Sequence, residues 1–166
     1  MIPARALDPQ PGERILDMCA APGAKATQLA ALADGKAEIV AIEMHSSRAS
    51  GLREMAERMG AVMTVIDGDA REVEIPGGLF DAVLVDAPCT GTGVLASRPD
   101  ARWRRREEAL APLVEIQQGL LNRALTLVKP GGRVVYSTCS LLNEENEDVV
   151  RASGGEIVDL TARFPG

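Results

Sequence analysis

Residues 14–25 read RILDMCAAPGAK, and this stretch decides the fold. Residues 14–18 form a short β-type run, with Pro11-Gly12 before it and Pro22-Gly23 after it. The segment from Lys25 to Leu32 is rich in Ala and Leu, which favour helices. We therefore predict a strand, a tight loop and a helix, the opening unit of an α/β domain.

The rest of the chain repeats this alternation of short β-type runs with longer helical stretches. Strands that alternate with helices through right-handed crossovers form a doubly wound, mostly parallel sheet, with ligands at the carboxyl ends of its strands. The fold class that we predict is therefore α/β. We expect further strands over residues 38–42, 61–66, 80–85 and 133–137, helices over residues 46–59, 107–128 and 143–152, helix caps at Ser46 or Ser47 and at Asn143, and a last short run at residues 156–158.

The composition excludes several classes of protein. Hydrophobic residues make up 46% and charged residues 25% of the 166 residues, which is ordinary usage for a globular protein. No apolar run approaches the roughly 20 residues of a membrane-spanning helix, and the N-terminus has no long apolar signal core. We expect a single domain over residues 1–166, cytoplasmic and monomeric, with no contact to a membrane.

Cysteine usage and net charge narrow the possibilities further. Cys19, Cys89 and Cys139 are an odd number and widely spaced, which fits neither a disulfide framework nor a C-x-x-C zinc site. We expect three free thiols and no metal. The net charge of −6 argues against a strongly basic nucleic-acid-binding module that acts alone.

Three loops that follow predicted strands carry candidate cofactor-binding residues. The small residues of the loop at 19–25 let a ligand approach the backbone at a helix start, although a tight packing turn is the alternative. Glu43 ends the second strand, where nucleoside-binding folds place a carboxylate for ribose hydroxyls; a surface acid is the alternative. Asp69 can reach an adenine amine, but a turn or capping role suits both Asp69 and Asp67. His45, the only histidine, is not expected to be catalytic.

Two thiols and a carboxylate follow the fourth and fifth predicted strands. Asp86 and Cys89 lie in DAPCTGTG (86–93), and Cys139 lies in TCS (138–140). A single buried cysteine usually serves packing, but two that follow strands directly, on polar loops, favour chemistry. Carbon 5 of cytosine is a poor nucleophile, and a thiolate that adds to carbon 6 makes it reactive toward a sulfonium methyl group. Asp86 then suits nitrogen 3 of the ring, and Cys89 suits release of the product.

The ionisation of Cys139 is left open by the sequence. A free thiol is only slightly ionised at neutral pH. The following helix start favours the Cys139 thiolate, whereas Glu144, Glu145 and Glu147 partly cancel that field.

Four motifs together resemble the Sun (Fmu) family of RNA 5-methylcytosine methyltransferases, over nearly the whole chain. They are LDMCAAPGAK (16–25), FDAVLVDAPCTGTG (80–93), RPDARW (98–103) and KPGGRVVYSTCSLLNEENEDVV (129–150). The resemblance implies a Rossmann-like class I fold that transfers a methyl group from S-adenosylmethionine to carbon 5 of cytosine in RNA, with Cys139 as nucleophile and Cys89 in product release. It implies that the cofactor is bound by Cys19, Ala20, Ala21, Pro22, Gly23, Ala24, Lys25, Glu43, Asp69 and Asp86.

The chain departs from the family pattern at two positions, Ala24 in place of a second Gly and Glu43 in place of Asp. Residues 98–104 are most similar to the bacterial branch that modifies 16S ribosomal RNA. Members of the family carry an N-terminal RNA-binding region, and their sheet continues into a final hairpin. We therefore expect a chain that is truncated at both ends, with that hairpin incomplete.

Arg98, Arg102, Trp103 and Arg104 are the candidate RNA-binding residues, because arginines cluster here on an otherwise acidic chain. A solvated loop paired with the glutamates at 107 and 108 is the alternative. The alternative functions are the same chemistry on transfer RNA, a catalytically silent RNA-binding or ribosome-assembly scaffold, and a nicotinamide dehydrogenase. The dehydrogenase is disfavoured because the loop at 19–25 is not its G-x-G-x-x-G and because it leaves Cys89 and Cys139 unexplained.

Overall fold

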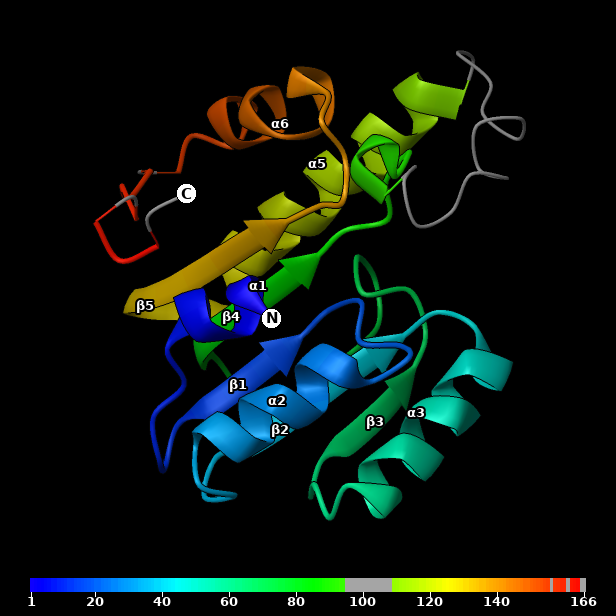
Figure 1. Cartoon of the computed structure of the whole chain (residues 1–166), viewed down its shortest axis with the longest axis vertical. Helices are drawn as coiled ribbons and strands as arrows, with labels where there is room; N and C mark the ends of the chain where they lie inside the picture. The colour runs from blue at the N-terminus through cyan, green and yellow to red at the C-terminus, as the bar shows by residue number, and fades with distance from the viewer. Residues whose placement is uncertain (95–108, 156, 161, 165–166) are drawn as a thin grey trace.

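The computed structural model describes residues 1–94, 109–155, 157–160 and 162–164. Within them, five parallel strands form one sheet in the order β3-β2-β1-β4-β5 (Figure 1). The chain reverses its direction of travel across the sheet between β1 and β4, which confirms the predicted doubly wound topology. The strands are β1 (Arg14–Asp17), β2 (Glu38–Glu43), β3 (Thr64–Asp67), β4 (Phe80–Asp86) and β5 (Val128–Ser137).

Helices cover both faces of this sheet. Helices α1, α2 and α3 lie on one face, while α5 lies on the other face and carries α6 against it (Figure 1). None of the described helices is long and apolar enough to cross a membrane. The helices are α1 (Ile2–Leu7), α2 (Ala24–Leu32), α3 (Ser46–Arg58), α5 (Leu110–Leu127) and α6 (Glu147–Ala152), with short 3-10 turns η1 (Thr92–Val94) and η3 (Asn143–Glu145).

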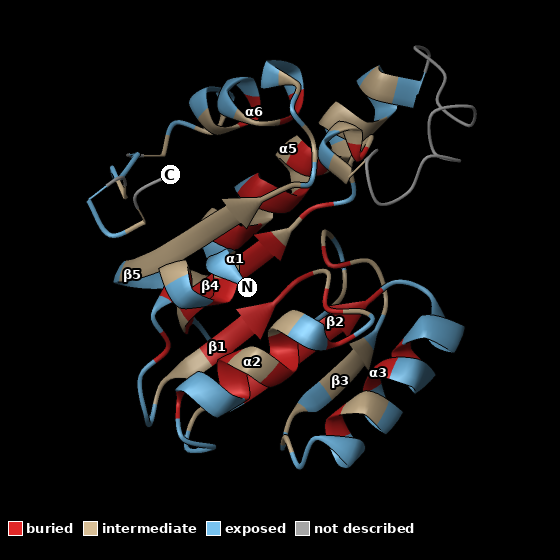
Figure 2. Ribbon diagram, in the orientation of Figure 1, coloured by how far each residue is buried: buried red, intermediate tan, exposed pale blue. Residues whose placement is uncertain are grey.

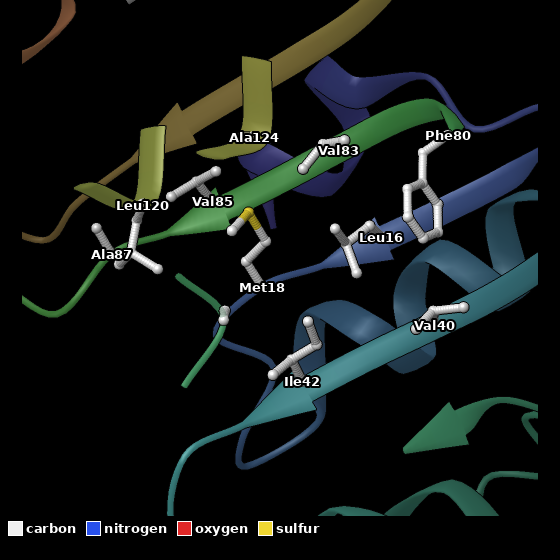
Figure 3. Close-up of a cluster of buried hydrophobic side chains, with 11 residues drawn as sticks. Leu16, Met18, Val40, Ile42, Phe80, Val83, Val85, Ala87, Leu120 and Ala124 are labelled. Carbon is white, nitrogen blue, oxygen red and sulfur yellow. The ribbon is translucent and has the colours of Figure 1, made fainter. Parts of the chain in front are cut away.

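The core divides between the two faces because successive strand residues point to opposite sides. On the α5 side, the side chains of β1, β2 and β4 meet Leu120 and Ala124 of α5 (Figure 3). The central strands are buried on both faces, as parallel strands between two helical layers must be (Figure 2). The α5-side cluster includes Leu16, Met18, Val40, Ile42, Phe80, Val83 and Val85, and the opposite cluster includes Leu7, Ile15, Leu29, Ile39 and Leu84.

Strand β5 begins earlier than the sequence predicted. Val128 pairs with Phe80, and Arg133 pairs with Ala82, so the residues between them bulge out of the ladder. Pro130 lacks a backbone N–H, and Gly131 adopts φ +78°, both of which a bulge accommodates. The Lys-Pro-Gly-Gly segment therefore ends helix α5 and also begins the strand.

The predicted helix caps were wrong. His45, with extended backbone angles, is the N-cap of α3, so the serines at 46 and 47 already lie in the helix. Asn143 begins the 3-10 turn η3, and Asn146 is the N-cap of α6. The run at 156–158 is not a strand at the described residues 157 and 158. Helix α1 was not predicted at all.

Candidate functional site

The predicted site residues converge at the carboxyl ends of the parallel strands. The loops after β1, β4 and β5 all leave the sheet on this side (Figure 1). Strands β1 and β4 are neighbours in the sheet, and the strand order reverses between them. In folds of this class, that point is where a ligand crevice opens.

The loop after β1 brings the chain tightly into helix α2. Gly23 is the N-cap of α2 with φ +112°, and a Cβ atom there would lie 2.9 Å from Leu52 Cδ1. The Gly23 N–H donates to the Ala20 carbonyl at 2.8 Å. Only a glycine fits this turn, which leaves the first N–H groups of α2 free for a ligand.

Asp17 is a buried acid that the sequence analysis treated only as part of a strand. It ends β1, is fully buried, and accepts a hydrogen bond at Oδ1 from the Cys19 N–H at 3.3 Å. Its Oδ2 atom has no hydrogen-bond partner within the described residues. Burial raises the pKa of Asp17 to about 7. An acid at the end of an otherwise apolar strand was the signal that could have revealed it.

Cys19 differs from the other two cysteines in its surroundings. Burial, followed by the negative charges of Asp17 and Asp86, raises the pKa of Cys19 to about 12. The thiol is therefore protonated at neutral pH and suits a wall of the site better than a nucleophile.

Lys25 and Asp86 join the first loop to the fourth strand. Lys25 Nζ lies 2.5 Å from Asp86 Oδ2, and the hydroxyl of Ser137 donates to Asp86 Oδ1 at 2.7 Å. The structure thus brings together two predicted residues and adds Ser137, which the sequence analysis did not single out.

Glu43 is a buried carboxylate at the end of β2. Its Oε1 atom accepts the His45 N–H at 2.9 Å and lies 3.3 Å from Arg48 Nη1. Arg48 also donates to the carbonyl of Ala21 at 3.1 Å, so it ties helix α3 to the loop after β1. Arg48, like Ser137, carries no signal in the sequence pattern that marks it as a site residue.

Asp69 lies after β3 and is held by Arg71. Arg71 donates to both carboxylate oxygens, with Nε 3.0 Å from Oδ1 and Nη2 2.5 Å from Oδ2. Hydrogen bonds from Arg71 lower the pKa of Asp69. Asp67, the alternative to Asp69, pairs with Arg53.

Cys89 and Cys139 are in contact. Their Sγ atoms lie 3.1 Å apart, and the Cys139 N–H donates to Cys89 Sγ at 3.3 Å. Cys139 is exposed, whereas Cys89 is half-buried. Burial, together with the neighbouring Cys139, raises the pKa of Cys89 to about 12. The exposed sulfur is thus paired with one that stays protonated at neutral pH.

A buried acid, Glu145, is hydrogen-bonded to the residue that follows Cys89. Glu145 is fully buried, and its carboxylate accepts hydrogen bonds from Thr90 and Gln117. In the sequence Glu145 is one of several acidic residues near a predicted helix start, and nothing there marks it as buried.

The four candidate RNA-binding residues, Arg98, Arg102, Trp103 and Arg104, lie outside the described residues, as do the glutamates at 107 and 108. Within the described ranges, no group of three or more His, Cys, Asp or Glu side chains is placed to hold a metal ion.

Residues 4–155 match the family described as 16S rRNA methyltransferase RsmB/F. The chain belongs to this family. It is 38% identical over 157 residues to the probable ribosomal RNA small subunit methyltransferase B of Bacillus subtilis, and 42% identical over 148 residues to the ribosomal RNA small subunit methyltransferase B of Salmonella newport. These alignments cover 92% and 88% of the chain but only 35% and 34% of the relatives. The chain therefore spans about a third of the length of the family members it matches.

Solved structures of relatives confirm the Rossmann-like methyltransferase fold. NSun6 from Pyrococcus horikoshii, solved with SFG, superposes with a TM-score of 0.83 at 36% identity, over 91% of this chain and 39% of that one. A methyltransferase homologue from the same organism gives a TM-score of 0.80 at 36% identity, over 91% and 47%. The likeness extends to TrmN from Thermus thermophilus, with a TM-score of 0.65 at 24% identity, which shows the shared fold alone.

Proposed function

We propose that this domain transfers a methyl group from S-adenosylmethionine to carbon 5 of cytosine in RNA, and that the RNA is 16S ribosomal RNA. The observation that carries the proposal is the exposed thiol of Cys139, 3.1 Å from the Cys89 sulfur, on the loops that follow the neighbouring strands β5 and β4. The names of the bacterial relatives support ribosomal RNA as the substrate.

The residues at the carboxyl ends of the strands suit S-adenosylmethionine. The buried carboxylate of Glu43 can accept hydrogen bonds from ribose hydroxyls, and the free N–H groups at the start of α2 suit a carboxylate. NSun6 was solved with SFG, an analogue of this cofactor. We assign its binding to residues 19–25, with Glu43, Asp69 and Asp86. When bound, the cofactor supplies an electrophilic methyl group on a sulfonium sulfur.

The chemistry begins at Cys139. Its thiolate adds to carbon 6 of the cytosine, which forms a sulfur–carbon bond and makes carbon 5 nucleophilic. As the ring gains electron density, nitrogen 3 takes up a proton; we assign the Asp86 carboxyl group to donate it, which leaves Asp86 as the carboxylate that Lys25 and Ser137 hold in place. Carbon 5 then takes the methyl group and leaves the sulfonium sulfur as a neutral thioether. Loss of the carbon-5 proton to a base re-forms the double bond between carbons 5 and 6 and expels the Cys139 sulfur as a thiolate.

Cys89 assists the last step. Its thiol is protonated at neutral pH because burial raises its pKa, and it lies next to the Cys139 sulfur. A hydrogen bond from Cys89 stabilises the negative charge on Cys139 when that sulfur departs. A cytosine within an RNA helix must first be flipped out to reach this site.

The test is transfer of a labelled methyl group to cytosine in RNA. Wild-type protein is expected to label cytosine, and Cys139→Ser is expected to abolish labelling while it still binds S-adenosylmethionine by calorimetry. Full activity of Cys139→Ser would overturn the mechanism. A wild-type protein that does not bind S-adenosylmethionine would favour the silent scaffold.

The substrate is tested separately from the chemistry. Mapping of 5-methylcytosine in cellular RNA, with and without the protein, is expected to show one or more positions in 16S ribosomal RNA that depend on it. Loss of 5-methylcytosine from transfer RNA instead would show that the same chemistry acts on transfer RNA.

A further inference from the structure

A polar cluster next to the Cys89 loop consists of Thr90, Gln117, Tyr136 and Glu145. Glu145 is its centre and is fully buried. Its Oε1 atom accepts the Thr90 N–H at 2.8 Å and the Gln117 side-chain amide at 3.0 Å, and its Oε2 atom accepts the Thr90 hydroxyl. Tyr136 donates to the Glu145 carbonyl at 2.7 Å. The carboxylate thereby joins η3 to α5 and to the loop after β4, and the backbone carbonyl of the same residue joins η3 to β5.

The cluster forms hydrogen bonds to the residues on both sides of Cys89. Thr90 follows Cys89 and bonds to Glu145 through both its N–H and its hydroxyl. Pro88 precedes Cys89, and its carbonyl accepts a hydrogen bond from Gln117 at 2.8 Å. The Gln117 Oε1 atom has no partner in the described part of the chain, so its two donated bonds are what orient this side chain.

The Cys139 loop is joined to the same cluster through hydroxyl groups. Ser140 follows Cys139, and its Oγ atom lies 3.3 Å from Thr90 Oγ1 and 3.0 Å from Thr92 Oγ1. The Cys139 carbonyl accepts the Gly93 N–H at 2.9 Å. The two loops that carry the thiols therefore share one hydrogen-bonded scaffold.

Glu145 remains a carboxylate in this buried place. Burial alone raises its pKa, but the hydrogen bonds from Ser140, Thr90 and Gln117 outweigh that effect and lower it. A buried charge is tolerated only where donors surround it, and hydrogen bonds to such a charge hold the groups that donate them in place. Two of the donors that satisfy Glu145, Thr90 and Ser140, directly follow the two cysteines.

We propose that Glu145 is a positioning residue that locks the Cys89 loop against the Cys139 loop and so keeps the two sulfur atoms in contact. Its importance for methyl transfer rests on the proposed function, whereas its effect on the thiols does not. Glu145 touches neither RNA nor cofactor in this scheme; it acts through Thr90, Gln117 and Ser140.

The test measures how closely the two thiols are held, by exchange with oxidised glutathione. The two protein thiols and one oxidised glutathione give one protein disulfide and two reduced glutathiones. The sulfur atoms are 3.1 Å apart, against about 2.05 Å in a disulfide, so little movement is needed. Peptide mass analysis locates the bond at Cys89 and Cys139 and keeps Cys19 out of the measurement.

Glu145→Leu removes both carboxylate acceptors and keeps the backbone carbonyl. It is expected to lower the equilibrium constant of the exchange with glutathione by roughly tenfold or more, since hydrogen bonds to a charged group are lost. Glu145→Gln is expected to stay close to wild type, because it retains one oxygen and the Thr90 hydroxyl can turn to accept from the new amide. Glu144→Leu is the matched control: this exposed neighbour on the same turn is expected to leave the constant unchanged.

If Glu145→Leu does not fold, Gln117→Met tests the proposal instead. It removes the hydrogen bonds from Gln117 to Pro88 and Glu145 and keeps the shape of the side chain. A wild-type constant in a folded Glu145→Leu or Gln117→Met protein would overturn the proposal. In the methylation assay, Glu145→Leu is expected to lower kcat and leave the KM for S-adenosylmethionine unchanged. A lowered exchange constant in a protein whose wild type methylates no RNA would leave the positioning role intact and reject the proposed function.

Discussion

The ammonium group of Lys25 lies 2.5 Å from the carboxylate of Asp86, so the first turn of α2 is fastened to the end of β4. The two side chains are about a quarter exposed, at 23% and 30%. An ion pair so open to water contributes about 1 kcal/mol or less to stability. The ion pair therefore matters mainly for position. It holds the loop after β1 next to the Asp86 carboxylate, where the strand order reverses between β1 and β4.

Lys25→Met is therefore expected to weaken binding of S-adenosylmethionine about tenfold, the effect of roughly 1.4 kcal/mol. The free energy of unfolding is expected to change by less than about 1 kcal/mol. Calorimetric titration gives the first quantity and urea unfolding the second. Lys36→Met is the control and should change neither, because Lys36 is exposed and lies before β2, away from the carboxyl ends of the strands. Unaltered affinity in Lys25→Met would show that the ion pair does not organise the cofactor loop.

Cys89→Ala is expected to trap the protein on its RNA. Without the thiol 3.1 Å from Cys139, release of the Cys139 sulfur slows, and the covalent adduct accumulates. A band of protein joined to RNA should then survive a denaturing gel. The double variant Cys89→Ala, Cys139→Ser should show no such band, because the nucleophile is gone. Free protein alone in the single variant would count against a role for Cys89 in release.

The sequence was sufficient for the sheet and for the pairing of the cysteines. Strand β4 is apolar along almost its whole length, which is typical of a strand buried on both faces, and the structure places it inside the sheet, between β1 and β5. The proximity of Cys89 to Cys139 followed from parallel topology alone, since neighbouring parallel strands end at the same edge.

What the sequence could not show were contacts between residues far apart along the chain. Glu145 lies in an acidic run whose other members point to solvent, and only the donors from Thr90 and Gln117 explain its burial. The bulge at the start of β5 was missed for a related reason. Pro and Gly signal the end of a helix, but their pairing against Phe80 is a tertiary contact.

Asp17 is expected to make stability fall as pH rises. Its folded pKa of about 7 exceeds its ordinary value of 3.8, so between these values the folded protein holds a proton that the unfolded chain has lost. The resulting stability is complete below about pH 4 and is lost as pH rises through about 7. Between pH 5 and pH 8 this loss is roughly 3 kcal/mol.

Asp17→Asn should remove that part of the pH dependence and keep an acceptor for the Cys19 N–H. Urea unfolding of both proteins at pH 5 and pH 8 measures the difference. Asp34→Asn, at an exposed position, should behave as the wild type does. An equal loss of stability in the wild type and in Asp17→Asn would contradict the assignment.

Gly93→Ala is expected to impair catalysis with little effect on folding. A Cβ atom at Gly93 would lie 3.0 Å from the Cys139 carbonyl oxygen, which must shift by a few tenths of an ångström, and Cys139 shifts with it. Since a misplacement of about 1 Å can cost a hundredfold in rate, a smaller shift should lower kcat about tenfold. Gly51→Ala is the matched control, because its Cβ atom meets only open space on α3. That variant should gain about 0.5–1 kcal/mol of stability from the better helix former and keep full activity. Equal activity in the two alanine variants would show that the carbonyl of Cys139 can move without disturbing its thiol.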